Sequence, residues 1–342
     1  MTKKTNNWGI AGIWNPSLLD REVRKTEPRD RLWASELGKA PVDTYLKLKG
    51  IEQTNPPNPR SLRKFEAGNI WEWIVSLILS RAGILQDAQK WTSYQYEEML
   101  PVTGRLDFYA GGKPDYERAT RELAQLNLPG VFLRASKNIV DTLSKQYPDG
   151  LSTKIIEVKS TSSFMFDSYE RNKTSSANHR MQLFHYLKAE NISEGLLMYI
   201  CKDDCRMLEI PVKNPSVVED EYKSNIETIS KYYYANEQPP LEKPIEFDSD
   251  LMKFSKNWKI AYSGYLTHLY GFKNQMEFDN KYSPLVERWN RVLGRIADGK
   301  DMTDNNKAAL EEMTKAGFEV DKIKEDILAA NINKTIQTTQ KT

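Results

Sequence analysis

Three charged residues in two short apolar stretches are the strongest candidates for chemistry in this sequence. Glu157 and Lys159 lie two positions apart in the stretch KIIEVKST, residues 154–161, and Asp107 lies in GRLDFY, residues 104–109. Side chains two positions apart on a β-strand share one face. If the two stretches form neighbouring strands, we expect these three side chains to converge at one end of a sheet.

This set of residues predicts metal-dependent phosphodiester chemistry. Two carboxylates can hold one or two divalent cations, the carbonyl of Val158 can add a ligand, and oxygen ligands favour Mg²⁺ or Mn²⁺. A bound cation lowers the pKa of a water molecule and neutralises charge on the phosphate, while Lys159 orients the water or stabilises the phosphate. The alternative is a solvated strand face on an unrelated α/β protein, because E-x-K is common by chance.

A further carboxylate lies on a helix. Residues 63–82 carry apolar side chains at helical spacing, and Glu72 lies among them, four residues after Gly68. A buried carboxylate is costly unless it is paired or binds a metal. Glu72 is therefore either a third metal ligand or a charge at the exposed edge of an amphipathic helix.

A polar stripe follows the KIIEVKST stretch. His179, Gln182 and Tyr186 lie at positions i, i+3 and i+7 of a helix predicted over residues 177–190. They are either donors that face the metal site and a DNA backbone, or an ordinary polar stripe.

The motifs GRLDFY, IIEVKST and QLFHY, in this order, resemble the RecB-like branch of the PD-(D/E)XK nuclease superfamily, including CRISPR-adaptation-type and phage exonucleases. That branch has G-x-x-D, (D/E)-x-K and Q-x-x-x-Y, preceded by a helical G-x-x-x-H in which Glu72 here replaces the histidine. The resemblance covers about residues 63–200. It implies four metal ligands, namely Glu72, Asp107, Glu157 and Val158. It also implies five catalytic or supporting residues, namely Asp107, Glu157, Lys159, Gln182 and Tyr186.

Two further features depart from the family pattern. The stretch ASELGKAPVDTYLKLKG is similar to the start of the CRISPR-adaptation type, in which a cysteine before the proline joins three C-terminal cysteines on an iron–sulfur cluster. Ala40 occupies that position, and the chain has only Cys201 and Cys205, which we expect to be structural. We therefore expect no iron–sulfur cluster.

The second departure is the distance between the two acids. Asp107 and Glu157 are 50 residues apart in sequence, where a tight hairpin is usual, and a helical insertion at about residues 113–150 would explain the gap. Asp149 is a rival, since Pro148-Asp149 spells a literal PD shortly before EVK. However, Pro-Asp-Gly is a strong turn signature, so we favour Asp107.

The chain is nearly neutral, with a formal charge of +2, so any DNA-binding surface has to be local. Basic and aromatic residues near the motifs are the candidates, namely Arg63, Arg105, Tyr169, Arg171, Lys173, His179 and Arg180. Lys64 and Phe166 are close to the same motifs. As alternatives, the aromatic residues pack the edge of the core, and Arg180 caps a carboxylate.

The order of predicted elements indicates an α/β fold. We expect a restriction-endonuclease-like mixed sheet flanked by helices, with a helical insertion and a helical C-terminal extension. The expected parts are an N-terminal helical arm and loop over residues 1–62, a nuclease core over 63–236, a helical region over 237–330, and a disordered tail over 331–342. Residues 161–176 read as a polar loop.

We expect a cytoplasmic DNA exonuclease of a bacterium or phage-infected cell. It would act on single strands or duplex ends in recombination, repair or phage DNA metabolism. No apolar run is long enough for a membrane span, and the N-terminus lacks a secretory pattern. The alternatives are an endonuclease of the same fold and a non-catalytic DNA-binding protein. A protein partner or self-association would use the C-terminal helices.

Overall fold

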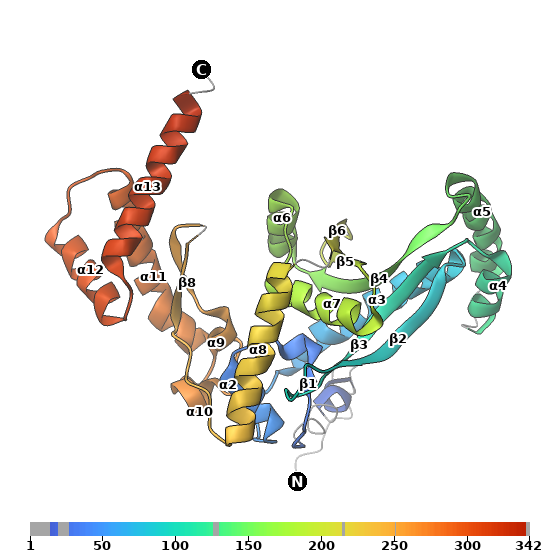
Figure 1. Cartoon of the computed structure of the whole chain (residues 1–342), viewed down its shortest axis with the longest axis horizontal. Helices are drawn as coiled ribbons and strands as arrows, with labels where there is room; N and C mark the ends of the chain where they lie inside the picture. Colours follow the sequence, from blue (N-terminus) through green and yellow to red (C-terminus); the bar gives the residue numbers. More distant parts are fainter. Residues whose placement is uncertain (1–13, 20–26, 126–129, 214–215, 250, 340–342) are drawn as a thin grey trace, which may run out of the picture. The chain divides into compact units, whose positions relative to one another are not determined.

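The computed structural model describes residues 14–19, 27–125, 130–213, 216–249 and 251–339 (Figure 1). The chain divides into two compact units. Unit 1 comprises Met1–Glu52 and Pro56–Pro239, and unit 2 comprises Gln53–Asn55 and Pro240–Thr342. The boundary expected at residue 62 falls inside a helix of unit 1, Pro59–Arg81, because that helix packs on the central sheet.

In the described part of unit 1, strands form one mixed sheet with the order β1-β3-β4-β5-β6, and β2 also pairs with β3. The strands are β1 Leu32–Trp33, β2 Leu85–Tyr94, β3 Val102–Gly112, β4 Leu151–Thr161, β5 Glu194–Cys201 and β6 Met207–Lys213. Strand β3 is antiparallel to β4, whereas β4 and β5 are parallel. The predicted fold class, a mixed sheet flanked by helices, is confirmed.

Two helices position the functional residues on this sheet. Helix α3, Pro59–Arg81, begins with the Asn58 side chain accepting the Ser61 N–H, and its Val75 and Leu79 pack on Val158. Helix α7, Ala177–Glu190, contributes to a second core cluster that contains Ile155 and Tyr199 of the sheet. The predictions of helices over 63–82 and 177–190 are confirmed.

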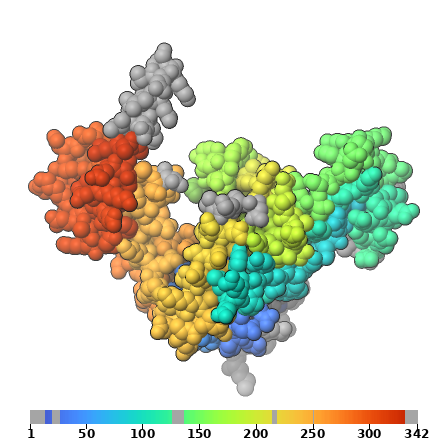
Figure 2. Space-filling view, viewed as in Figure 1, coloured from blue at the N-terminus to red at the C-terminus, as the bar shows by residue number. Residues whose placement is uncertain are grey.

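The 50-residue gap between the two acids contains the predicted helical insertion. Helices α4 Tyr116–Gln125 and α5 Gly130–Gln146 connect β3 to β4 and pack against α3. Figure 2 shows the green surface of this insertion projecting from the rest of unit 1. The rival Asp149 lies in the turn after α5, where it is exposed, at the end of β4 opposite to Thr161.

Two local predictions for unit 1 were wrong. Residues 161–176 contain helix α6, Ser163–Asn172, because Asp203 accepts the Ser163 N–H at 2.8 Å and Arg206 forms salt bridges with the helix. These contacts come from the β5–β6 turn, so local composition did not indicate them. Phe166 of this helix is fully buried and is not a base-stacking residue.

The N-terminal segment is also more than a helical arm. Residues 32–50 contain strand β1, the short helix η1 Ala34–Glu36 and helix α2 Pro41–Leu48. Strand β1 pairs in parallel with β3, so this segment belongs to the core. Helix α8, Ser216–Ala235, packs against α2 and α7.

Unit 2 is not purely helical, because it also contains the hairpin β7 Ile245–Asp248 and β8 Lys253–Lys256. Its helices are α9 Trp258–Ala261, α10 Leu266–Tyr270, α11 Gln275–Ala297, α12 Asp304–Lys315 and α13 Val320–Thr339. Phe254 of β8 packs on the buried Trp289 of α11. Helix α13 extends into the tail expected over 331–342, and residues 340–342 lie outside the described residues.

No helix in the described ranges has the length and apolar character needed to span a membrane.

A buried histidine ties α7 to its neighbours in unit 1. His185 is fully buried, and its ring nitrogens contact the Thr92 hydroxyl at 3.2 Å and the Tyr222 hydroxyl at 2.8 Å. Thr92 donates its own proton to the Gly104 carbonyl, so Nε2–H of His185 donates to Thr92 and Nδ1 accepts from Tyr222. The ring is therefore neutral and fully hydrogen-bonded.

This histidine makes stability depend on pH. Burial lowers the pKa of His185 to about 3, below the ordinary value of 6.5, so the unfolded state binds more protons between these values. The free energy of unfolding therefore falls as pH drops below about 6.5. Between about pH 7.5 and 5.5, urea titrations should show wild type losing about 1.4 kcal/mol relative to His185→Gln. An unchanged difference between the two proteins would contradict the neutral buried ring.

Candidate active site

The predicted acids meet where β3 and β4 separate. The two strands pair as far as Phe108 and Ile156, and Asp107 is the next residue on β3. Its Oδ2 accepts the backbone N–H of Val158 at 2.8 Å, so the side chain takes the position of a missing strand partner. Asp107 is therefore buried and oriented by the backbone of the strand that carries Glu157 and Lys159.

Glu157 and Lys159 form a close pair on β4. Lys159 Nζ lies 2.5 Å from Glu157 Oε1, and only 1% of the Glu157 side chain is exposed. The other carboxylate oxygen, Oε2, is buried and has no hydrogen-bond partner among the described residues. A buried acceptor without a partner is costly, so this oxygen is suited to a ligand.

Glu72 reaches the same place from α3. It lies one turn after Gly68, which faces β4, because a Cβ atom there would be 3.4 Å from Ser160 Oγ. Gln89 of β2 donates its side-chain N–H to Glu72 at 3.4 Å. Gln89 carries no distinguishing signal in the sequence, and its positive φ of 55° sets it apart only in the structure.

The charges of these residues act on one another. Burial raises the pKa of Glu72 to about 7, and the negative charge of Asp107 adds to this effect. Burial and then the charge of Asp107 raise the pKa of Glu157 to about 8, and burial also raises that of Asp107. Burial alone would lower the pKa of Lys159, but the negative charges of the three carboxylates have the larger effect and raise this pKa. Lys159, with a smaller contribution from Arg105, thus faces three acids that repel one another.

The donor set fits a hard divalent cation. It contains three carboxylates, and Oε2 of one of them, Glu157, has no hydrogen-bond partner among the described residues. Mg²⁺ and Mn²⁺ prefer oxygen ligands of this kind. Among the described residues, no three acid, histidine or cysteine side chains are grouped closely enough to hold a metal ion as they stand. Lys159 and the Val158 N–H occupy one oxygen each of Glu157 and Asp107.

Gln182 and Tyr186 of α7 lie beside the acids. Gln182 Nε2 donates to the Tyr186 hydroxyl at 3.0 Å. Burial raises the pKa of Tyr186, and the charges of Glu157 and Asp107 add to it, so the phenol stays protonated. The ring packs on Gly104, where an added Cβ would lie 2.7 Å from Tyr186 Cε1. This contact gives a physical reason for the glycine of GRLDFY.

Replacing Gly104 with alanine should therefore displace the Tyr186 ring. We expect Gly104→Ala to lower the free energy of unfolding by about 1–3 kcal/mol, because a methyl group must enter a fully packed space. Gly294→Ala is the matched control, since a Cβ there meets no atom within 4 Å and α11 favours alanine. Urea or thermal unfolding compares the two. A Gly104→Ala protein as stable as wild type would disprove the contact.

His179 lies next to the site and is neutral. Its Nδ1 is 2.8 Å from the Tyr199 hydroxyl, which also accepts the Ser176 N–H at 3.3 Å. The Tyr199 proton is then free to bond Nδ1, which leaves Nε2–H of His179 as a donor. Burial, followed by the positive charge of Lys159, lowers the pKa of His179 to about 3.

The structure separates the other predicted DNA contacts. Arg105 is exposed next to the acids, and its charge acts on Glu72 and Asp107. Arg171 and Lys173 are exposed at the C-terminal end of α6.

Three predicted contacts are engaged within the protein. Tyr169 packs on Tyr199 with ring centroids 4.6 Å apart. Arg63 donates to Asn15 Oδ1 at 2.5 Å, and Arg180 donates to Ser175.

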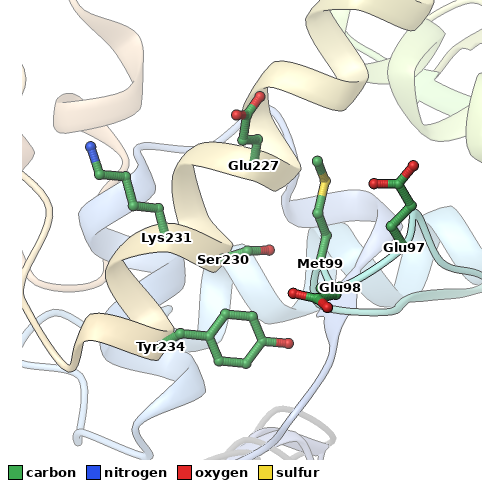
Figure 3. Close-up of a pocket in the computed structure, with 7 residues that line it drawn as sticks. All are labelled: Glu97, Glu98, Met99, Glu227, Ser230, Lys231 and Tyr234. Atoms are coloured by element: carbon green, nitrogen blue, oxygen red, sulfur yellow. The ribbon is translucent and has the colours of Figure 1, made fainter.

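A separate hollow in unit 1 contains none of the predicted site residues. It has a volume of about 510 Å³ and lies between the β2–β3 turn and α8 (Figure 3). Glu97, Glu98 and Glu227 line it, with Tyr234 projecting from α8. Three carboxylates repel a phosphate, so this hollow is a poor candidate for a DNA contact.

No family model and no curated protein matches this chain. Solved structures similar to it include SSO0001, with 12% identity and a TM-score of 0.44 over 77% of this chain and 98% of that one. Another is LHK-Exo in complex with dAMP, with 10% identity and a TM-score of 0.37 over 66% of this chain and 93% of that one.

Proposed function

We propose that this protein is a metal-dependent deoxyribonuclease of the PD-(D/E)XK type. The observation that carries the proposal is the grouping of Asp107, Glu157 and Lys159 at the separation of β3 and β4, next to Glu72. Buried acids that repel one another cost stability, so a chain that places them together has a use for a cation.

Each residue has a distinct role in this proposal. Asp107 and Glu157 would hold a Mg²⁺ or Mn²⁺ ion, with the Val158 carbonyl and Glu72 as further ligands. Such an ion, when bound, would supply a water molecule of lowered pKa and neutralise charge on the phosphate. The Lys159 ammonium donates a hydrogen bond to the attacking water or to a phosphate oxygen. The phenol of Tyr186 and the amide of Gln182 keep the acids in place.

The mode of cleavage follows from the sequence resemblance, which favours an exonuclease on single strands or duplex ends. Such an enzyme would serve DNA recombination, repair or phage DNA metabolism. Arg105, Arg171, Lys173 and His179 are the proposed DNA contacts, because Arg105 and His179 lie next to the acids and Arg171 and Lys173 remain exposed on α6.

The proposal is tested with end-labelled linear and covalently closed circular single-stranded DNA, incubated with Mg²⁺, Mn²⁺ or EDTA. We expect metal-dependent loss of the linear strand alone. Cleavage of the circle would indicate an endonuclease. Binding of both substrates without cleavage in any metal would favour the non-catalytic alternative.

A further inference from the structure

A basic side chain lies on the same face of α3 as Glu72. Lys64, Gly68 and Glu72 are four residues apart, so they lie above one another along the helix. Gly68 faces β4 near Ser160, and the row therefore runs along the end of that strand. At 1.5 Å per residue, Lys64 lies about 12 Å along the helix from Glu72.

A second lysine lies at the same end of β4. Lys202 follows β5, and its backbone N–H donates to the Thr161 carbonyl at 2.8 Å. Burial, followed by the positive charge of Lys64, lowers the pKa of Lys202. Neither lysine forms a salt bridge with a described residue, although the charge of the neighbouring Asp203 acts on the pKa of Lys202 in the opposite direction to that of Lys64. Two neighbouring positive charges repel each other, and a bound anion relieves this repulsion.

An exposed aromatic ring follows the same end of β4. Phe164 is 80% exposed at the start of α6, three residues after the end of β4. The helix that carries it is anchored, because Arg206 forms salt bridges with Asp167 and Glu170 at 2.7 and 3.2 Å. Since Asp203 caps the N-terminus of α6, the anion-binding capacity here comes from the lysines and not from the helix end.

We propose that Lys64 and Lys202 bind a backbone phosphate of the substrate strand beyond the scissile one, and that Phe164 stacks on a neighbouring unpaired base. This rests on the proposed nuclease function. A cationic groove with an exposed aromatic ring binds single strands without sequence preference, and a ring can stack only on a base that has no partner strand covering it. The strand that enters the site is therefore single-stranded, either free or frayed from a duplex end.

The test measures binding in EDTA, where no cleavage occurs. Fluorescence anisotropy with labelled oligothymidine is recorded over a series of salt concentrations. We expect Lys64→Ala/Lys202→Ala to weaken binding at least about 10-fold, and to lower the slope of log Kd against log salt by about 0.7 for each phosphate that is no longer bound. Phe164→Ala should weaken single-strand binding on the order of 10-fold with an unchanged slope, and weaken a blunt duplex less.

Matched control variants distinguish the loss of this site from a general loss of positive charge or of an exposed aromatic ring. Lys137→Ala/Lys213→Ala removes two equal charges elsewhere on unit 1, and Tyr234→Ala removes another exposed ring, so both should bind like wild type. Lys64→Arg/Lys202→Arg should retain binding. The proposal is wrong if the alanine variants at Lys64, Lys202 and Phe164 behave like these controls.

Cleavage and binding measured on the same set of proteins distinguish failure of this proposal from failure of the proposed nuclease function. Wild type that cuts DNA, with variants that bind as tightly as wild type, overturns only the phosphate and stacking site. Wild type that binds through these residues but cuts in no metal overturns only the nuclease. Wild type that binds no DNA overturns both.

Discussion

Lys159→Met is expected to reduce DNA cleavage by about 10²–10³-fold, because it removes the ammonium that meets the phosphate or the attacking water. It also leaves Glu157 Oε1 without its partner in a buried position. Removing one member of a buried ion pair costs about 3–5 kcal/mol, so the variant should also unfold at lower urea concentration. Cleavage rates with Mn²⁺ and urea titrations measure the two effects.

Lys154→Met is the matched control, because it makes the same change on β4. Side chains alternate along a strand, so Lys154 points to the opposite face from Glu157 and Lys159. It should cleave DNA at the wild-type rate. A Lys159→Met protein that is folded and fully active would rule out the proposed role of the lysine.

Asp107→Asn is expected to separate stability from activity. The amide oxygen can still accept the Val158 N–H, but the negative charge that repels Glu157 and Glu72 is removed. In EDTA the variant should therefore be more stable than wild type by about 1 kcal/mol or more. Mn²⁺ should raise the thermal midpoint of wild type and not that of the variant, and cleavage should fall at least about 10²-fold.

Asp149→Asn is the control for this experiment. Asp149 is the rival acid in the Pro-Asp-Gly turn, where it is exposed. Its variant should match wild type in stability, in the Mn²⁺-induced shift and in cleavage. If Asp149→Asn loses activity while Asp107→Asn keeps it, Asp149 is the metal-binding acid and Asp107 is not.

Residues with a strict local pattern were predictable from the sequence. The β-branched run around Glu157 and the apolar period of residues 63–82 specify a strand and a helix, and both form. Two features were hidden because they depend on distant residues. Helix α6 forms in a Ser-rich stretch through salt bridges from Arg206, and β1 joins the sheet by pairing with β3. The composition of a short sequence segment contains no information about contacts with residues elsewhere in the chain.

The site residues also divide into those that the sequence predicted and those that it did not. The order of the motifs predicted that Asp107 would meet Glu157, although their separation of 50 residues departs from the family pattern. The separation of β3 and β4, which makes room for the Asp107 side chain, has no signal in the sequence. Lys202 and Phe164 were also missed, because only the parallel β4–β5 pair and helix α6 bring them to the same end of β4.

The insertion α4–α5 has a consequence for how this chain can change. It enters after Gly112 and returns at Leu151, which are paired to each other, so the strands close below it. Asp107 is thus joined in space to the strand that carries Glu157 by its hydrogen bond to the Val158 N–H, and the insertion joins the two acids only along the chain. Shortening or replacing this segment would keep that hydrogen bond, but it would remove the packing of α4 and α5 on α3, the helix that carries Glu72. A change in this segment is therefore expected to reach the acids through α3 and Glu72, and not through the pairing of β3 with β4.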